Sequence, residues 1–331
     1  MKAMRLDKFG EDAPFEMFDR PDVEPGPGEV AVRLYATSVN PVDTKIRADG
    51  GGGIAPGDPV VLGCDVAGAV LGVGPGVSKF SEGDEVYGCA GGVKGRDGTY
   101  AQRMIADERL LARKPATLSF REAAALPLVA ITAWESLVDR ANVQPGETVL
   151  VHGGSGGVGH IGVQLAKLCG AIVHATVGSD DNARIARELG ADETINYRKQ
   201  SVAEYVEGLT GGRGYDVVFD TVGGPNLASS IEALANNGRC ATTVSMGASP
   251  DLSGLHIKNA SLHVTFMLVP MLTGKGLERH GMIMERIAAL VDCGRIKPLI
   301  DDSRFSLDQI DAAHKRVTSG KATGKVVVDI A

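Results

Sequence analysis

One short segment constrains the fold of this chain more than any other, because a predicted strand, a glycine-rich turn and a predicted helix follow one another directly. The strand is Thr148–His152, the turn contains Gly154, Gly156 and Gly159, and the helix covers Ile161–Cys169. In that context a G-x-G-x-x-G pattern lets the backbone approach a pyrophosphate, with the positive end of the helix facing it. The segment therefore predicts a dinucleotide site; a purely structural glycine turn is the alternative.

The same alternation of strand and helix continues downstream. A helix is expected at Asn182–Leu189, and further strands are expected at Ile172–Val177, Thr194–Tyr197, Asp216–Asp220 and Cys240–Val244. Repeated units of this length predict a parallel sheet that is covered by helices on both faces.

The first 113 residues have a different texture, with short apolar runs separated by glycine and proline. The runs are Val30–Val39, Val60–Val73 and Glu85–Tyr87, which predict a compact, barrel-like β domain. Ser119 with Glu122 marks the start of a helix. Near the C-terminus, helices are expected at Gly281–Val291 and Gln309–Val317, and the strand Gly324–Ile330 is expected to rejoin the β domain. A chain of 331 residues fits two such domains.

Charge and composition exclude several classes of partner. The net charge is −7 and no block of lysine or arginine is present, which disfavours nucleic acid and anionic membranes. The N-terminus lacks the apolar core of a signal peptide, and Leu262–Leu272 is too short to span a membrane. The 5 cysteines form no C-x-x-C pair, so a cytoplasmic protein without a disulfide framework or zinc knot is expected.

The end of the second predicted strand bears on the choice of cofactor. An acidic side chain there selects NAD by binding the ribose, but this strand ends in Gly178-Ser179. Arg184 and Tyr197 lie near enough in sequence to contact a 2′-phosphate, whereas Asp180 and Asp181 would repel it unless they serve only the helix N-terminus. NADPH is therefore preferred over NADH as the expected cofactor.

Five motifs carry a resemblance to a known family: Ser38–Lys45 (SVNPVDTK), Gly63–Gly68 (GCDVAG), Gly98–Ala101 (GTYA), Ile131–Trp134 (ITAW) and His152–Gly159 (HGGSGGVG). With them the chain resembles the medium-chain dehydrogenase/reductase superfamily, and within it the zinc-independent quinone oxidoreductases, which include zeta-crystallin and plant enone and alkenal reductases.

The resemblance implies an α/β fold of two domains. A GroES-like β-barrel domain would comprise 1–117 and 296–331, and a Rossmann domain with a doubly wound parallel sheet would comprise 118–295, with the nicotinamide in the cleft between them. It also implies a homodimer that joins sheets edge to edge through Ser261–Met267.

The resemblance implies that Thr132 contacts the nicotinamide end of the cofactor. Together with the glycine turn and the strand tip, the full set expected to contact NADPH is Thr132, Gly154, Ser155, Gly156, Gly157, Val158, Gly159, Gly178, Ser179, Arg184, Tyr197 and Val222.

Departures from the alcohol-dehydrogenase branch bear on the metal. That branch binds catalytic zinc through a cysteine in the first motif and a histidine in the second, where this chain has Asn40 and Cys64-Asp65. A catalytic zinc requires three protein ligands, so no metal is expected and Cys64 is interpreted as a small buried residue. Without a Lewis acid, hydride transfer to a quinone or an α,β-unsaturated carbonyl is favoured over exchange with an alcohol.

The resemblance of the Ser38–Lys45 motif implies that two residues serve that chemistry. Lys45 would stabilise charge on the substrate oxygen, although a solvated surface lysine is the alternative. Asn40 would donate to the substrate or the nicotinamide ribose, or else cap a turn before Pro41. Asp43 is expected to hold the loop. Tyr87 and Tyr100 either line the cleft or pack in the β domain.

Gly50–Gly53 is either a lid over the substrate or a plain loop, and no histidine is nominated as a proton donor. The predicted function is thus an NADPH-dependent reductase of quinones or enones. A zinc alcohol dehydrogenase and a non-catalytic NADPH-binding protein are the alternatives.

Overall fold

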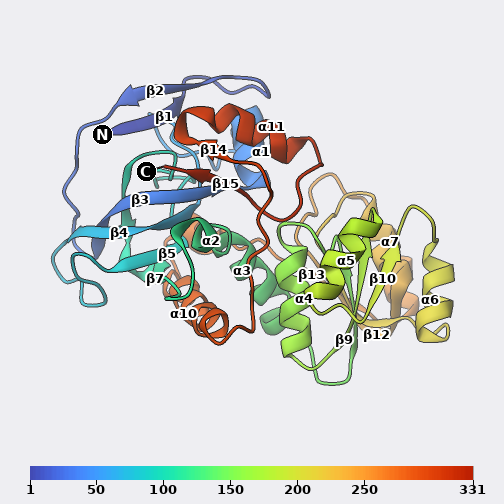
Figure 1. The fold of residues 1–331 in the computed structure, drawn as a ribbon. Coiled ribbons are helices and arrows are strands. Elements are labelled where there is room, and N and C mark those ends of the chain that lie inside the picture. Colours follow the sequence, from blue (N-terminus) through green and yellow to red (C-terminus); the bar gives the residue numbers. More distant parts are fainter. Residues whose placement is uncertain (331) are drawn as a thin grey trace. The chain divides into compact units, whose positions relative to one another are not determined.

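The structure is a computed structural model that describes residues 1–330, and these residues form two compact units (Figure 1). Unit 1 contains Met1–Leu128, Leu268–Gly294 and the chain from Ile300 onward, so both ends of the chain belong to it. Unit 2 contains Val129–Met267 and Arg295–Leu299.

Unit 1 is built on a seven-stranded sheet with the order β14-β15-β3-β4-β5-β7, in which β6 also pairs with β3. The strands are β3 (Glu29–Val39), β4 (Asp65–Val73), β5 (Glu85–Cys89), β6 (Arg103–Asp107), β7 (Leu111–Arg113), β14 (Phe305–Ser306) and β15 (Val326–Asp329). β15 pairs antiparallel with β3, with Val326 opposite Val39, so the last strand completes the N-terminal β domain as expected. A separate antiparallel pair consists of β1 (Lys2–Leu6) and β2 (Phe15–Asp19).

The helices of unit 1 come from distant parts of the sequence. They are α1 (Pro41–Asp49), α2 (Phe120–Ala124), α9 (Val269–Thr273), α10 (Glu278–Asp292) and α11 (Ile310–Thr318), with 3₁₀ turns at Glu108–Leu110 and Leu307–Gln309. The predicted capping box of Ser119 and Glu122 opens α2. α10 packs on β5 and β7, and the Tyr87 hydroxyl donates to the Met284 carbonyl at 2.6 Å. This contact explains why 268–294 clusters with unit 1; the expected boundaries at 117/118 and 295/296 remain a prediction.

Unit 2 contains a six-stranded parallel sheet with the order β10-β9-β8-β11-β12-β13. Its strands are β8 (Thr148–His152), β9 (Ile172–Val177), β10 (Glu193–Asn196), β11 (Tyr215–Asp220), β12 (Leu234–Thr242) and β13 (Ser261–Val264). The chain builds outward from β8 to β10, returns to β11 beside β8, and builds outward again to β13. This is the doubly wound order, and it confirms the predicted parallel sheet.

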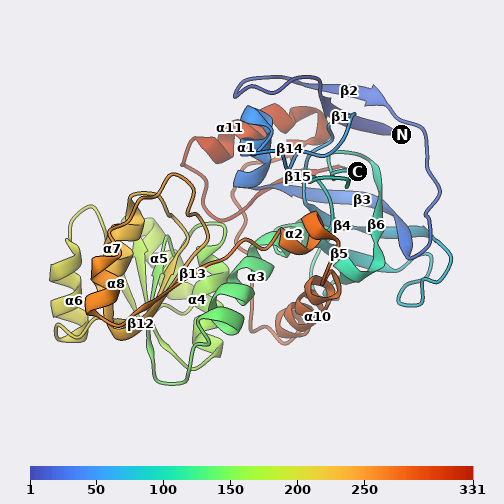
Figure 2. The same cartoon turned by 180° about the vertical axis from the view of Figure 1, so that it is seen from behind.

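The helices between these strands are α4 (Gly159–Leu168), α5 (Asp180–Glu188), α6 (Val202–Thr210), α7 (Asn226–Ala233) and α8 (Ser253–Ile257). Figure 2 shows α7 and α8 side by side. β8 and β11 are apolar without alternation, and Val149, Leu150 and Val151 are fully buried, as expected for strands covered on both faces. α3 (Pro127–Trp134) contains the boundary between the units and continues as a π-helical turn over Glu135–Arg140.

Candidate cofactor site and candidate catalytic residues

The glycine turn, Gly153–Gly159, connects the carboxyl end of β8 to α4. Close approach of backbone explains its glycines. A Cβ on Gly154 would lie 2.6 Å from the Ala175 Cβ on β9, and a Cβ on Gly159 would lie 2.0 Å from the Gly153 carbonyl oxygen. The positive φ of the turn belongs to Gly153, at +70°, one residue before the first glycine of the motif. Packing, rather than turn conformation, therefore requires glycine at 154 and 159.

The turn presents open backbone donors at the point where the strand order reverses. Within residues 1–330, the N–H groups of Gly157 and Val158 have no acceptor. Val158 opens α4 without a side-chain cap, so the positive end of the helix is free to bind an anion. Ser155 is largely buried beside these donors. In open parallel sheets this reversal point, at the carboxyl ends of the strands, is where ligands bind.

His152 and Thr176 hold the start of the turn. The Thr176 hydroxyl accepts the Gly153 N–H at 3.1 Å and lies 3.2 Å from His152 Nδ1. Burial lowers the pKa of His152 to about 4, with Asp220 opposing the shift, so the imidazole is neutral near pH 7. His152 thus has a structural role at the start of the turn.

The tip of β9 is neutral and is covered by a tyrosine. A Cβ on Gly178 would lie 3.2 Å from the Tyr197 hydroxyl, and the Tyr197 side chain remains 55% exposed. Ser179 caps α5, since its hydroxyl accepts the Asn182 N–H at 3.2 Å. Asp180 and Asp181 lie in the first turn of α5, as expected of helix N-terminal acids.

Two arginines lie near this tip, and only one was predicted. Arg184 pairs with Glu188 at 2.8 Å, and both side chains are more than 60% exposed. Arg198 was missed; its guanidinium carbon lies 5.8 Å from the centre of the Tyr197 ring. The Tyr-Arg-Lys run after β10 was the available signal, because a cation beside a tyrosine at a strand tip suits a phosphate.

The remaining predicted cofactor residues also belong to unit 2. Val222 follows β11 and is 55% exposed, and its N–H donates to the Asp220 carboxylate at 3.0 Å. The same carboxylate accepts the Gly223 N–H at 2.9 Å, which fixes the loop beyond the strand. Thr132 is a buried residue of α3.

In unit 1, Asn40 belongs to a group of side chains that we call the buried lysine cluster: Ser38, Asn40, Asp65 and Lys325. Asn40 is fully buried, its Nδ2 donates to Asp65 at 2.8 Å, and its Oδ1 accepts from the Lys325 ammonium. Asn40 also precedes Pro41, the first residue of α1. Lys325 and its contact with Asn40 were missed, because 285 residues separate them.

Asp43 holds the loop, as expected. Its carboxylate accepts the Asn40 N–H at 2.8 Å and the Gly63 N–H at 3.2 Å. Burial raises the pKa of Asp43 to about 7; the two N–H bonds and Lys325 oppose that shift, and Asp65 adds to it.

Lys45 lies on the opposite, exposed side of α1 from the buried residues Asp43 and Ile46. Its ammonium has no hydrogen bond or ion pair with any residue in 1–330. It is therefore free to bind a ligand, and the surface-lysine alternative stays open.

Cys64 is fully buried, as predicted, with its thiol 3.7 Å from Asp43 Oδ1. The contact with Cys89 and burial raise the pKa of Cys64, so the thiol is protonated. In residues 1–330 no three histidine, cysteine or acidic side chains are arranged to bind a metal ion.

Tyr87 and Tyr100 are fully buried in unit 1, which favours the packing interpretation of both. The Tyr100 hydroxyl lies 2.9 Å from His314 Nε2. Gly50–Gly53 forms a turn in which all four φ angles lie between +60° and +88°, a conformation that glycine tolerates best. A Cβ on Gly51 would also lie 2.7 Å from Ile46, so this run is needed for the turn; its role as a lid remains a prediction.

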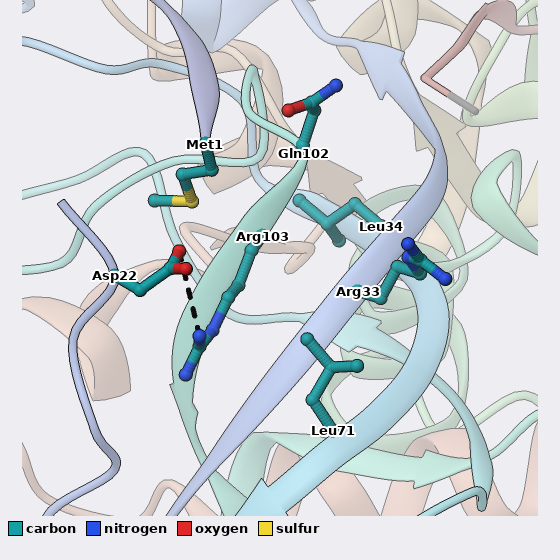
Figure 3. A pocket seen from close by; sticks show the side chains of 7 residues that line it. All are labelled: Met1, Asp22, Arg33, Leu34, Leu71, Gln102 and Arg103. Carbon is teal, nitrogen blue, oxygen red and sulfur yellow. Dashed lines mark ion pairs between the residues drawn. The ribbon is translucent and has the colours of Figure 1, made fainter. Parts of the chain in front are cut away.

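A separate pocket of about 240 Å³ opens on unit 1 and contains none of the predicted site residues (Figure 3). Arg33 on β3 and Arg103 on β6 are register partners, and the Arg103 guanidinium points toward Asp22, which lies 3.6 Å from it. Met1, Leu34, Leu71 and Gln102 line the rest. The pocket therefore contains one ion pair, between Asp22 and Arg103, to which we assign a structural role. Within the described residues, no helix is long and apolar enough to cross a membrane.

Comparison with known proteins adds two family matches. Residues 26–116 match the alcohol dehydrogenase GroES-like domain, and residues 189–328 match a family described as zinc-binding dehydrogenase. The first match confirms the expected GroES-like domain.

Similar whole proteins point in the same direction. The chain is 33% identical to a quinone oxidoreductase of Pseudomonas aeruginosa over 99% of both chains. It is 39% identical to a 2-haloacrylate reductase of a Burkholderia species, over 66% of this chain and 65% of that one. The crystal structure of Escherichia coli quinone oxidoreductase complexed with NADPH has a TM-score of 0.87 and 27% identity, covering 99% of this chain and 100% of that one.

Proposed function

Because the chain belongs to the medium-chain dehydrogenase/reductase superfamily, in its zeta-crystallin-like quinone oxidoreductase branch, we propose that it is a zinc-independent, NADPH-dependent reductase of quinones or α,β-unsaturated carbonyls. The glycine turn carries this proposal. Its glycines let the backbone pack where a Cβ would collide, and its open donors lie at the carboxyl edge of the sheet, where ligands bind.

The residues of unit 2 fit a dinucleotide. The N–H groups of Gly157 and Val158, with the positive end of α4, would hold the pyrophosphate. Thr132, Ser155 and Val222 are proposed to contact the rest of the cofactor, which supplies a hydride when bound.

We infer a preference for NADPH over NADH from the tip of β9. The strand ends in Gly178 and Ser179, so its tip has no carboxylate. Such a carboxylate would bind the ribose hydroxyls of NADH and would repel the 2′-phosphate of NADPH. Tyr197 and Arg198 offer a hydroxyl and a cation there. The relative from Escherichia coli was crystallised with NADPH, which supports the same preference. Arg184 remains a candidate, although its pairing with Glu188 makes it less available.

Lys45 is proposed as the residue that contacts the substrate. As hydride adds to a conjugated carbon, negative charge develops on the carbonyl or quinone oxygen, and a nearby ammonium would stabilise it. Lys45 has the required charge, exposure and free donors. Asn40 is enclosed and both ends of its amide are engaged, so we assign it to the frame that holds α1.

We further propose a homodimer that pairs through β13. This strand lies at the edge of the sheet in unit 2, where Val264 and Phe266 are 44% and 45% exposed. An apolar edge strand is a template for pairing with another strand. Analytical ultracentrifugation of wild type and Val264→Lys tests this, because the charged variant should sediment as a monomer. A monomeric wild type would contradict the proposal.

The experiment that tests the function is a panel of quinones, enones and enals assayed with NADPH and with NADH. We expect turnover that is faster with NADPH and is unchanged by a chelator. Stoichiometric zinc together with oxidation of alcohols would identify an alcohol dehydrogenase instead. Tight NADPH binding without turnover of any acceptor would leave a non-catalytic binding protein.

A further inference from the structure

Lys325 is a buried cation in a protein whose other lysines mostly reach solvent. Its side chain is 3% exposed, and it immediately precedes β15, the last strand of the chain. Removing an ammonium from water is unfavourable, so a lysine is buried only where its donors are matched by acceptors. Three acceptors meet Lys325 Nζ: the Val39 carbonyl at 3.4 Å, the Asn40 side-chain oxygen, and the Asp65 carboxylate at 3.5 Å.

These contacts fix the side chain of Asn40 in one orientation. The amide oxygen faces the ammonium, and the amide nitrogen donates to Asp65 at 2.8 Å. Flipping the amide would place N–H groups against the ammonium and a carbonyl oxygen against the carboxylate. Asp65 is in turn held by the Ser38 hydroxyl and by the Leu128 N–H at 2.8 Å. The cluster is therefore a closed set of charge-assisted bonds.

The cluster also fixes the start of α1. Asn40 is the residue before the helix, and its N–H donates to Asp43, which binds the Gly63 N–H as well. The other end of α1 is held by Arg47, whose Nε donates to the Ala13 carbonyl at 2.9 Å and which also pairs with Asp311. Lys45 lies between these anchors on the exposed side of the helix.

We propose that Lys325 is a positioning residue for the reductase reaction: by binding Asn40 and Asp65 it fixes the N-terminal end of α1, and with it the direction in which Lys45 presents its ammonium. This inference rests on the proposed function, in which Lys45 contacts the substrate oxygen. The aliphatic part of Lys325 packs in the interior, but its charge is what holds the amide of Asn40. Loss of the charge alone should therefore disturb α1.

The test compares Lys325→Met, which keeps the length and removes the charge, with Lys325→Arg, which keeps the charge. Lys8→Met, at an exposed lysine of the same unit, is the matched control. Quinone reduction with NADPH is measured at a temperature where all variants are folded. We expect Lys325→Met to lower kcat at least tenfold with KM changed less than threefold, and Lys325→Arg to recover part of the loss.

A double variant separates positioning from plain stabilisation. In a Lys45→Ala background, Lys325→Met should lower kcat no further, because the group that it positions is gone. Effects that multiply, or a kcat of Lys325→Met equal to that of Lys8→Met, would overturn the proposal. If Lys325→Met does not fold, Asp65→Asn removes the counter-charge with little change of shape and is expected to give the same pattern.

Hydrogen exchange provides a readout that does not depend on turnover. The amides of Thr44–Asp49 should lose at least tenfold of their protection in Lys325→Met, while those of α4 keep theirs. Unchanged protection of α1 contradicts the positioning role, whatever the activity. A wild type that reduces none of the acceptors contradicts the proposed function instead, and the exchange result still decides the role of Lys325.

Discussion

The glycine turn and the buried lysine cluster are built in opposite ways. The turn uses seven consecutive residues, and its donors are backbone N–H groups that any sequence possesses once the chain can approach closely. The cluster uses side chains from β3, from Asn40 between β3 and α1, from β4 and from the segment before β15, and 260 residues separate Asp65 from Lys325. The first depends on the absence of side chains, and the second depends on the identity of each one.

The largest expected effect tests the cluster. Asp65→Ala leaves the Lys325 ammonium buried without its counter-charge, so we expect the free energy of unfolding to fall by about 3–5 kcal/mol. Glu188→Ala, which removes the exposed pair with Arg184, is the control and should change stability by less than about 0.5 kcal/mol. Urea denaturation of both variants measures the difference. If both variants changed the free energy of unfolding by the same small amount, the cluster would stabilise the fold no more than an exposed salt bridge does.

The turn is tested next by Gly159→Ala. Its Cβ would lie 2.0 Å from the Gly153 carbonyl oxygen, so the backbone must move and the pyrophosphate donors with it. We expect the Kd for NADPH to rise at least about 100-fold, which is about 2.7 kcal/mol. Gly208→Ala on α6, where nothing lies within 4 Å of the new Cβ, should bind like wild type. Fluorescence titration measures both, and unchanged binding by Gly159→Ala would refute the packing argument.

The free energy of unfolding should depend on pH in opposite ways through the titratable groups of the two regions. The pKa of Asp43, beside the cluster, is raised to about 7, so the folded state holds a proton that the unfolded state releases above pH 4. This group lowers stability as pH rises from about 4 to 7. His152 at the turn and His314 in unit 1 have pKa values lowered to about 4 and about 3 by burial. They act in the opposite direction, and stability is lost as pH falls below about 6.5.

The variant Asp43→Asn isolates the first of these groups. Between pH 5 and 6.5 its unfolding free energy should rise with pH more steeply than that of wild type, by up to about 1.4 kcal/mol per pH unit. Above pH 8 the two slopes should agree. The comparison uses slopes, because the asparagine also loses one backbone acceptor and shifts the absolute stability. Parallel curves from pH 5 to 8 would show that Asp43 is ionised throughout.

The smallest expected effect concerns the phosphate end of the cofactor. Arg198→Ala should weaken NADPH about fivefold, roughly 1 kcal/mol, and leave NADH unchanged, since only NADPH carries the 2′-phosphate. Arg184→Ala is the matched comparison and should change NADPH binding less than twofold because of its pairing with Glu188. The measurement is the Kd of each variant for NADPH and for NADH. A larger loss of NADPH affinity in Arg184→Ala than in Arg198→Ala would mean that Arg184 binds the 2′-phosphate.

Much of unit 2 was predictable because its information is local. The strands β8, β9 and β11 were placed within one or two residues, as apolar runs bounded by glycine and polar residues. The return of the last strand to the N-terminal β domain was also expected, although its pairing with β3 was not predicted. The predicted ends of strands were wrong where the sequence has no periodicity. The apolar run Val60–Val73 contains a strand only from Asp65 onward. Strand β12 begins at Leu234, before the expected Cys240.

The site was predictable to different degrees for the same reason. The spacing of Gly154, Gly156 and Gly159 predicted a dinucleotide site. In the structure the residue of the turn with a positive φ is Gly153, which precedes the motif. Asn40 was singled out, but its neighbours were not, because sequence separation gives no sign that Lys325 reaches it. Arg198 was overlooked, since its significance depends on the Tyr197 ring beside Gly178.

By itself the sequence determined the parallel sheet, the glycine turn and the branch of the superfamily, because each follows from short-range spacing and residue type. Only the tertiary structure decided what surrounds Asn40. A buried ammonium requires three acceptors at once, and the pairing of β15 with β3 brings Val39, Asn40 and Asp65 within its reach. Burial then shifted the pKa values of His152 and Asp43, a shift that depends on the loss of water around them and on no local pattern.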